Sequence, residues 1–451
     1  MIKRLPINYI LKITFLINAI LKYNYFPSSW KTAVIFPIFK TGSPANNPTS
    51  YRPISLLDSI GKIAEYFIIQ KIKSHLTNNN ILIPHQFGFR EHHSATHQAY
   101  RLIENITTGN KSKRKTAAVF LDISKAFDKV WIDGLIFKLI KLNFPPHVIH
   151  LIKSYLQNRH FRTTVSGVLS NIYNCNAGLP QGSILSPTLY NIYTNDIPRT
   201  NTTQLAIFAD DTAIYSTHRN KNYAILAITR HLTLLSDYFH KWKILINVNK
   251  TKAIIFNTRP NTRNDRHIIL QDTPLPWSDE VKYLGIYFDY QLTFKYHIEH
   301  LRKKFRASKN RLYPLIARNS ELNTKNKLLL YNSFLRPLIT YGCPVWGYAA
   351  KTNIELLTKA QNSTIRQILN VPYYLFNRHI YKRIKTPRLE NHIESLVQNF
   401  HNNLSNLNNQ LINEIAAYPL NQANRKRPRA ALNIVSHLSL SRNLTSTPSP
   451  P

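Results

Sequence analysis

The stretch Ala206–Tyr215, AIFADDTAIY, places two adjacent aspartates, Asp210 and Asp211, between two short apolar runs. The β-branched and aromatic residues of these runs favour strands. The pattern therefore predicts a hairpin with a pair of carboxylates at its tip. Adjacent carboxylates repel each other and are costly to desolvate. Either they form an ordinary acidic turn in solvent or they hold divalent metal ions, and only other parts of the chain can distinguish these interpretations.

The bulk composition indicates a folded, strongly basic protein. The chain has 451 residues, 43% of them hydrophobic, which is enough for about two to four domains with a sizeable core. It carries 59 Lys and Arg against 22 Asp and Glu, a formal net charge of +37. This excess predicts a polyanionic partner, and nucleic acid is the leading candidate. A generally basic, ribosome-like protein is the alternative, and such a protein also binds nucleic acid.

The two cysteines and the N-terminus exclude several classes of protein. Cys175 and Cys343 provide neither a disulfide framework nor a Cys-rich zinc module, and we expect reduced cysteines in an intracellular protein. The apolar stretch Tyr9–Leu21 is interrupted by Lys12 and is followed by no small-residue cleavage site, so it predicts an amphipathic helix. No uninterrupted apolar run of ~18 residues occurs, so we expect no transmembrane helix and no membrane partner.

Along the chain, apolar periodicity and breaking residues predict a mixture of helices and strands. We expect helices over 1–30, Ile60–Ile72, a following segment through Asn105, most of Ile136–Leu156, Leu185–Ile197, Tyr223–Lys241 and, with several breaks, His297–Leu369. We expect strands in Trp30–Lys40, Ala117–Leu121, Ile244–Phe256 and Val281–Phe288. The basic run Arg425–Arg429 and the terminal Thr445–Pro451 indicate a basic tail ending in disorder.

A third carboxylate, Asp122, ends the apolar run Ala117–Leu121. Such a residue either caps the next turn or points into a site. Phosphoryl transfer by two metal ions needs aspartates from different strands that converge at one sheet edge. Asp122 forms such a set with Asp210 and Asp211 if the two strands are neighbours. Asp128 is a rival, but we expect it to cap or pair locally.

The segment Ala177–Ile184, AGLPQGSI, predicts a tight bend before a helix. Gly178, Pro180 and Gly182 favour the bend, which can bring backbone and Gln181 against a nucleotide or a template base. The alternative is a plain turn before a helix, because a Gly-rich turn alone is weak evidence of a site.

Seven blocks occur along the chain in a fixed order: YRPISLL, QFGFR, FLDISKAFDKV, AGLPQGSILSPTLYNIYTND, FADD, NKTKAIIF and VKYLG. In this order they resemble the successive sequence blocks of reverse transcriptases from non-LTR retrotransposons, in particular the jockey-like group. The resemblance covers roughly residues 25–375. It implies an RNA-directed DNA polymerase, a nucleotidyltransferase whose partners are an RNA template, a DNA primer, their RNA–DNA hybrid and dNTPs.

The resemblance also implies an α+β, right-hand polymerase with fingers, a palm of antiparallel sheet plus helices, and a helical thumb. We expect an N-terminal extension and the start of the fingers in 1–50, fingers and palm in 51–290, the thumb in 291–375 and a basic, partly disordered tail in 376–451. Basic faces of the thumb helices would follow the backbone of the duplex.

By this resemblance, Asp122, Asp210 and Asp211 are the catalytic ligands of Mg²⁺, with Mn²⁺ as an alternative ion, and Asp210 is the surer ligand of the doublet. Phe127 lies under the sugar and discriminates against a 2′-hydroxyl, although core packing is an alternative or additional role. The other implied substrate contacts are Ile123, Pro180, Gln181 and Gly182, and the basic residues Arg90, Arg52 and Lys40 at the triphosphate.

Two further roles follow from the resemblance. Lys252 matches a lysine proposed to protonate the pyrophosphate leaving group, and plain electrostatic stabilisation is the alternative. Tyr283, Leu284 and Gly285 match a hairpin that supports the primer end. For Arg90, Arg52 and Lys40, a surface or ion-pair role remains the alternative to phosphate binding.

The chain also departs from the family's longer members. No segment upstream of residue 25 reads as an endonuclease, no Cys/His knuckle is available, and no segment reads as RNase H. We therefore expect the polymerase portion alone, from either a truncated element copy or a fragmentary gene, and we do not expect this chain to nick the target. An endonuclease on another chain is a candidate partner. The run RKRPR at Arg425–Arg429 is either a nuclear import signal or a phosphate contact. The alternative function is a catalytically inactive, decayed or domesticated nucleic-acid-binding relic.

Overall fold

A four-stranded antiparallel sheet, the palm sheet, forms the centre of the molecule. Its strand order is β7 (Gln204–Phe208), β8 (Asp211–His218), β3 (Lys115–Leu121) and β9 (Lys252–Phe256). The computed structural model describes residues 4–40, 42–257, 266–372, 374–407, 409–416 and 427–433. The three strands expected around the aspartates are thus present and adjacent.

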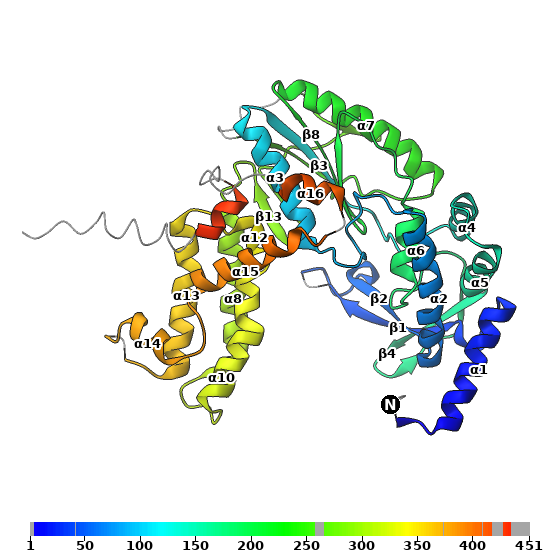
Figure 1. Cartoon of the computed structure of the whole chain (residues 1–451), viewed down its shortest axis with the longest axis horizontal. Coiled ribbons are helices and arrows are strands. Elements are labelled where there is room, and N and C mark those ends of the chain that lie inside the picture. The colour runs from blue at the N-terminus through cyan, green and yellow to red at the C-terminus, as the bar shows by residue number, and fades with distance from the viewer. Residues whose placement is uncertain are drawn as a thin grey trace, which may run out of the picture.

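Strand β3 is buried on both faces, which explains its unbroken apolar sequence. Val119 and Leu121 pack into a core shared with helix α7 (Lys221–Lys241), whereas Ala118 and Phe120 pack into a second core shared with α3 (Ala95–Lys111). Side chains alternate across a strand, so one strand separates two cores. In Figure 1, α7 and α3 are seen on either side of the sheet.

Helices α4 (Ile132–Lys141), α5 (Pro146–Leu156) and α6 (Ser186–Tyr193) extend the core that contains α7. The buried Lys138 ties α4 to its neighbours, because its Nζ donates to Asp196 Oδ1 at 2.6 Å and lies 3.7 Å from the ring centroid of Trp242. Burial lowers the pKa of Lys138 to about 8. A buried ammonium needs such partners.

A second sheet, the fingers sheet, lies to one side of the palm sheet (Figure 1). Its strand order is β2 (Tyr51–Leu56), β1 (Thr32–Phe39), β4 (Arg159–Val165) and β5 (Val168–Leu169), with β6 (Tyr173–Cys175) also paired to β4. Short 3₁₀ turns at Ser28–Trp30 and Pro48–Ser50 precede β1 and β2. Helix α2 (Ser59–Asn78) packs against α5, and α1 (Ile7–Tyr23) packs against α2.

The segment Val281–Phe288, expected as one strand, is a hairpin of β12 (Glu280–Tyr283) and β13 (Ile286–Asp289). The expectation of a single strand was wrong because Leu284 and Gly285 both adopt positive φ angles, 49° and 82°, which reverse the chain. A small hairpin of β10 (Ile269–Leu270) and β11 (Thr273–Pro274) precedes it.

Helices follow in the region expected to form the thumb, on the opposite side of the palm sheet from the fingers sheet (Figure 1). They are α8 (Lys295–Arg311), α9 (Tyr313–Ile316), α10 (Thr324–Leu330), a π turn at Tyr331–Leu335, α11 (Arg336–Thr340), α12 (Cys343–Trp346) and α13 (Lys351–Leu369). Two of the predicted breaks are confirmed, because Pro314 follows a turn at Leu312 and Pro344 follows a turn at Tyr341–Gly342. The break expected at Pro337 was wrong, because α10, the π turn and α11 follow one another without interruption.

The segment after residue 376 differs from the basic tail that we expected. It forms α14 (Asn377–Arg383), α15 (Leu389–Leu404), α16 (Gln410–Ala416) and a 3₁₀ turn at Pro428–Asn433. Helix α15 buries Leu389, Ile393, Val397 and Leu404. These residues recur at helical spacing, but the Asn and His residues between them make the pattern hard to recognise in the sequence. Arg425 and Lys426 of the basic run and the terminal Thr445–Pro451 lie outside the described residues.

The α+β class implied by the sequence blocks is confirmed by this mixture of antiparallel sheets and packed helices. The expected domain boundaries remain predictions. Over the ranges that the structure describes, no helix combines the length and the apolar composition needed to cross a membrane.

Candidate active site

The predicted hairpin around the aspartate doublet is confirmed. Phe208, the last residue of β7, pairs with Asp211, the first residue of β8, so that Ala209 and Asp210 form a two-residue turn. Ala209 adopts the left-handed conformation, with φ at 56°. Asp210 is half-buried in the turn, whereas Asp211 is exposed at the start of β8. The doublet therefore stands at one end of the palm sheet.

Asp122 reaches the same end from the neighbouring strand. The last pair between β3 and β8 joins Leu121 to Thr212, so Asp122 follows at the level of Asp211. The carbonyl of Asp122 accepts a hydrogen bond of 2.8 Å from the N–H of Asn247, which fixes the chain just beyond β3. The condition set by the sequence, neighbouring strands with converging aspartates, is met.

The carboxylates affect one another electrostatically. Although part of the Asp211 side chain reaches solvent, desolvation by the surrounding protein raises the pKa of Asp211 to about 6, with Asp210 and then Asp122 as further causes and Lys282 opposing them. Burial also raises the pKa of Asp210, and Asp122 adds to this rise, while Arg52 opposes it. Within the described ranges, none of the three aspartates takes part in an ion pair. Negative charge is therefore concentrated at this end of the sheet.

These side chains form an open set rather than a closed cage. In the part of the chain that the structure describes, no three Asp, Glu, His or Cys side chains are grouped closely enough to enclose a metal ion. The donors are nonetheless carboxylate oxygens, the type that Mg²⁺ and Mn²⁺ take in proteins. Their repulsion would also be relieved by a cation, so the residues fit a divalent metal site by charge and donor type.

A pocket of about 220 Å³ opens beside Asp122 and Asp211. Its other lining residues are Phe120, Leu121, Thr212, Lys250, Lys252, Val281, Lys282 and Tyr283. The predicted Lys252, the first residue of β9, pairs with Phe120 and is thereby brought to the carboxylates. Lys250 and Lys282 line the same pocket, and the sequence analysis did not single them out. Two aspartates and three lysines thus line the same pocket.

Phe127 lies between two other aromatic rings. It stacks on Tyr190 with ring centroids 4.8 Å apart and planes inclined by 28°, and it meets Phe89 edge-on at 5.9 Å. Tyr190 is buried, and burial together with Asp210 raises the pKa of its hydroxyl. Phe89 is exposed and adopts a φ of 56°, which is strained for a residue with a side chain. The sequence did not indicate that Phe89 and Tyr190 lie on either side of Phe127.

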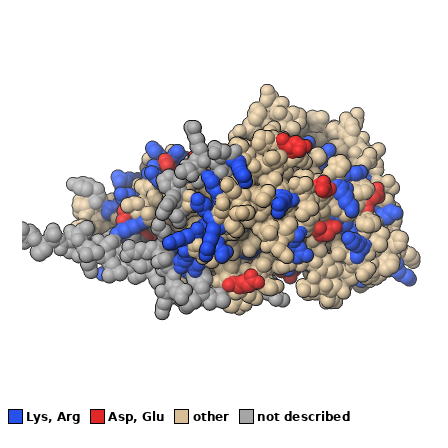
Figure 2. Space-filling model, turned by 90° about the horizontal axis from the view of Figure 1, so that it is seen from above, with Lys and Arg blue, Asp and Glu red and all other residues tan. Residues whose placement is uncertain are grey.

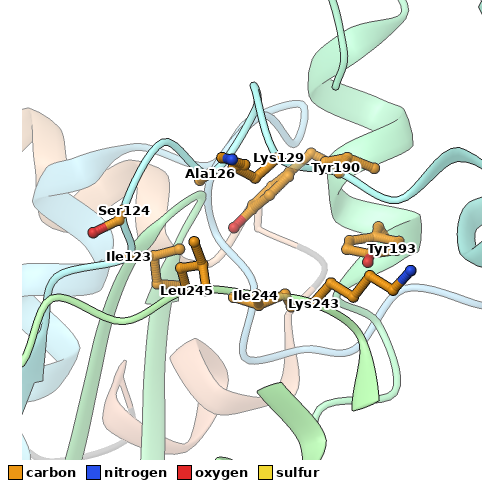
Figure 3. Close-up of a pocket in the computed structure, with 10 residues that line it drawn as sticks. Ile123, Ser124, Ala126, Lys129, Tyr190, Tyr193, Lys243, Ile244 and Leu245 are labelled. Atoms are coloured by element: carbon orange, nitrogen blue, oxygen red, sulfur yellow. The ribbon is translucent and has the colours of Figure 1, made fainter. Parts of the chain in front are cut away.

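Ile123, predicted to contact the substrate, lines a small pocket beneath this region. The pocket, of about 10 Å³, is also lined by Tyr190 and Leu245. Figure 3 shows the side chain of Ile123 close to Leu245, with the ring of Tyr190 above them. The main chain of Ile123 also bridges to Ile246. The side chain of Ile123 thus packs against other apolar groups, and substrate contact by Ile123 remains a prediction.

The bend at Pro180–Gly182 is held against the fingers sheet. The carbonyl of Gln181 accepts a 2.7 Å hydrogen bond from the N–H of Ser55 in β2. Gly182 has a φ of 130°, and a Cβ there would lie 2.5 Å from the carbonyl oxygen of Ser55, so only glycine fits. The bend therefore holds the chain that leads into α6 against β2.

The side chain of Gln181 is engaged by Asp128. Its Nε2 donates to Asp128 Oδ1 at 2.7 Å, and burial is the main cause that raises the pKa of Asp128. The expectation that Asp128 pairs locally was wrong, because its partner lies in a loop that folding brings back against it. Asp128 is absent from the group that perturbs Asp210 and Asp211.

A buried carboxylate beneath the bend was also missed. Glu65 of α2 is 2% exposed and accepts hydrogen bonds from the hydroxyls of Tyr155 and Ser183, both at 2.9 Å, and from the N–H of Ile184 at 2.8 Å. These bonds fasten the chain that follows Gly182 to α2. In the sequence, the only sign of this role is that Glu65 stands on the otherwise apolar face of a helix, and that sign is weak.

The predicted basic residues have different surroundings. Arg52, exposed on β2, lies near enough to Asp210 to oppose the rise in its pKa. Arg90 donates to the carbonyls of Ile83 and Gln86, at 2.9 and 3.3 Å, and so supports a loop. Lys40 donates to the carbonyl of Thr49 at 2.8 Å. Phosphate binding by these three residues remains a prediction.

The hairpin residues Tyr283, Leu284 and Gly285 connect the palm sheet to the thumb helices. The hydroxyl of the buried Tyr283 donates to the carbonyl of Ala206 in β7 at 3.0 Å. The carbonyl of Leu284 accepts a 3.0 Å bond from the hydroxyl of Tyr341, which follows α11. A Cβ at Gly285 would lie 3.1 Å from the Tyr341 ring. Primer support by this hairpin remains a prediction.

Comparisons with known proteins agree with this geometry. A family model described as "Reverse transcriptase (RNA-dependent DNA polymerase)" matches residues 38–288. The probable RNA-directed DNA polymerase from transposon X-element of Drosophila melanogaster is 35% identical over 434 residues, which are 95% of this chain and 48% of that protein. The RNA-directed DNA polymerase from mobile element jockey of the same organism is 33% identical, over 88% of this chain and 44% of that protein.

The chain thus spans about half the length of the curated relatives it matches. Among solved structures, apo telomerase from Candida Tropicalis has a TM-score of 0.43 and 11% identity, covering 95% of this chain and 70% of that one. The resemblance to jockey-like non-LTR retrotransposon proteins, expected from seven ordered blocks, is confirmed by the relatives. The chain belongs to the reverse transcriptase (RNA-dependent DNA polymerase) family.

Proposed function

We propose that this chain is an RNA-directed DNA polymerase that extends a DNA primer on an RNA template with dNTPs. The observation that carries the proposal is the convergence of Asp122, Asp210 and Asp211 at one end of the palm sheet, where burial and the charges of Asp210 and Asp122 raise the pKa of Asp211. Membership of the reverse transcriptase family supports the assignment.

Asp122, Asp210 and Asp211 would hold two divalent ions, Mg²⁺ or in its place Mn²⁺. When bound, such ions supply charge neutralisation at the attacking 3′-hydroxyl and at the pyrophosphate leaving group. The protein contributes three carboxylates from the end of β3, the turn and the start of β8, and their side chains would draw together around the ions. Lys252 lies beside them and either donates a proton to the pyrophosphate or stabilises its charge.

The nucleotide would lie against Phe127 and the bend at Pro180–Gly182. The Phe127 ring is backed by Tyr190 and therefore cannot retreat from a bulky sugar substituent. Gln181 and Gly182 are held by Asp128 and Ser55, which keeps this side of the site rigid. Arg52 stands near Asp210 and is suited to the triphosphate, because a guanidinium binds phosphate oxygens in pairs.

Nucleic acid is the partner that the charge favours. Helix α8 alone carries Lys295, Arg302, Lys303, Lys304, Arg306, Lys309 and Arg311. Figure 2 shows Lys and Arg side chains across one face of the molecule, several of them gathered in a band. Backbone phosphates of a primer–template duplex would neutralise these charges, and binding should weaken as salt rises.

The test is primer extension on poly(rA) with an oligo(dT) primer and Mg²⁺, comparing the wild type with Asp210→Asn. Extension by the wild type and a loss of at least about 10³-fold in Asp210→Asn supports the proposal. Equal extension by the two proteins contradicts it. Binding of primer–template without any incorporation by the wild type would instead identify a catalytically inactive nucleic-acid-binding relic.

A further inference from the structure

The segment QFGFR, Gln86–Arg90, lies along the free edge of the palm sheet beside β7. Gln86 forms a parallel bridge with Ile207, the N–H of Phe87 donates to the carbonyl of Ile207 at 2.9 Å, and the N–H of Ile207 donates to the carbonyl of His85 at 3.2 Å. The segment therefore covers the edge strand that leads directly into the aspartate turn.

The side chain of Gln86 continues this contact into the turn itself. Its Oε1 accepts hydrogen bonds from the N–H of Gly88 at 2.8 Å and from the N–H of Ala209 at 2.9 Å. The two main chains are in close contact, since a Cβ on Gly88 would lie 2.2 Å from the nitrogen of Ala209. One amide oxygen thus binds both chains where they meet.

The position of this contact is significant because Ala209 is strained. A left-handed φ is unfavourable for a residue with a Cβ, so other interactions must hold it. Asp210 is the next residue, and the backbone angles of Ala209 set the direction of its carboxylate. The hydrogen bond from Ala209 to Gln86 is the contact that fixes the entry to the turn.

The environment of Gln86 also indicates that its side chain does more than fill space in the core. Its side chain is 2% exposed, and its Nε2 has no hydrogen-bond partner among the described residues. A buried donor without a partner is costly, so an apolar residue would pack here at lower cost if the acceptor oxygen were not needed. The function of the Gln86 side chain is therefore to supply the acceptor oxygen that binds Gly88 and Ala209.

We propose that Gln86 is a positioning residue for Asp210, holding the left-handed turn at Ala209 so that the Asp210 carboxylate faces Asp122 and Asp211. The effect of Gln86 on activity rests on the proposed function, since the orientation of the Asp210 carboxylate matters only if the carboxylates bind cations. The hydrogen-bond geometry itself is independent of that function.

The matched comparison is Gln86→Met with Gln98→Met. Gln98 is also fully buried at this sheet edge, and its Nε2 donates to the carbonyls of His85 and Ile207, but it makes no contact with Ala209. Gln86→Glu keeps an acceptor oxygen at the same reach. Gln86→Asn keeps the amide but is one methylene shorter, and it serves if Gln86→Met fails to fold.

Two measurements on the full chain test the role. Hydrogen exchange followed by mass spectrometry on peptides that cover residues 205–213 reports the Ala209 amide, and free Mn²⁺ measured by electron paramagnetic resonance reports cation affinity. For Gln86→Met we expect exchange of this amide to accelerate about tenfold and Mn²⁺ affinity to fall about tenfold. Gln98→Met and Gln86→Glu should stay near the wild type in both measurements.

Wild-type exchange at Ala209 in Gln86→Met overturns the proposal, as does an equal loss of Mn²⁺ affinity in Gln98→Met or a failure of Gln86→Glu to retain binding. Primer extension should follow Mn²⁺ affinity across the series. If the wild type extends no primer, the proposed function fails, whereas the exchange comparison still tests the positioning role.

Discussion

The ring of Phe127 stacks on the ring of Tyr190 at 4.8 Å, and Tyr190 is buried. A ring backed in this way cannot move aside for a 2′-hydroxyl, so Phe127→Val should relax discrimination against ribonucleotides by roughly 10- to 100-fold. The measurement is the ratio of kcat/KM for dTTP and UTP on poly(rA). Tyr190→Phe keeps the stack and serves as the control, with discrimination near that of the wild type. An unchanged ratio in Phe127→Val would assign Phe127 to core packing alone.

The pKa of Asp211, raised to about 6, predicts a pH dependence of metal binding. The folded protein holds this proton more tightly than the unfolded chain, so without metal its stability should fall as pH rises from about 4 to about 6. A divalent cation binds the ionised form and offsets this loss. Saturating Mg²⁺ should therefore raise the Tm by a few degrees at pH 7.5 and little at pH 5.

The matching variant is Asp211→Asn, which removes the titrating group. Its melting temperature without metal should vary less between pH 4 and pH 6 than that of the wild type, and Mg²⁺ should stabilise it less at pH 7.5. The same Mg²⁺ effect at both pH values in the wild type would show that Asp211 does not control cation binding.

Lys252 lines the pocket that contains Asp122 and Asp211, together with Lys250 and Lys282. Positive charge is thus supplied by several side chains, so we expect the specific contribution of Lys252 to be proton donation. Lys252→Ala should lower kcat by about 10²-fold, and Lys252→Arg should not restore it. Lys250→Ala is the control, with a smaller loss. Near-normal kcat in Lys252→Arg would assign Lys252 a purely electrostatic role.

Glu65 is buried and accepts three hydrogen bonds, two of them from Ser183 and Ile184 just after the bend at Pro180–Gly182. Glu65→Gln replaces one acceptor oxygen with a donor, and it should cost about 1–3 kcal/mol of stability. The loosened bend should raise the KM for dNTP several-fold while leaving primer–template affinity unchanged. Urea denaturation and steady-state kinetics measure the two effects.

The control for Glu65→Gln is Glu91→Gln, which removes the same charge at an exposed position. The side chain of Glu91 is 72% exposed and pairs with Lys73, so its loss should change stability by less than about 1 kcal/mol. A KM for dNTP that remains normal in Glu65→Gln would show that the bend is held without this carboxylate.

The three aspartates proposed as metal ligands could be located from the sequence because each follows from a local pattern. The unbroken apolar run before Asp122 predicts a buried strand, and the two short apolar runs on either side of Asp210 and Asp211 predict a hairpin. Gly182 was likewise visible, since its bend requires an angle that only glycine adopts readily. The ordered blocks then indicated which of these features belong to one site.

The local pattern failed to predict helix α15, because many polar residues lie between its apolar ones. Helix α15 carries its apolar residues at helical spacing among Asn, His and Gln, and this region was expected as a tail. The apolar pattern around Leu284 and Gly285 predicted a continuous strand, because nothing but a glycine interrupts its alternation, whereas the family resemblance implied the hairpin that is found there.

What the sequence by itself determined is the inventory of the site, namely three aspartates, an aromatic ring and a glycine bend at strand ends and turns, because short-range sterics and hydrophobic periodicity specify such positions. What only the tertiary structure decided is how that inventory is held. Gln86 on Ala209, Asp128 on Gln181 and Glu65 on Ser183 join segments far apart in the chain. These bonds depend on which buried surfaces pack together, and local sequence carries no record of that choice.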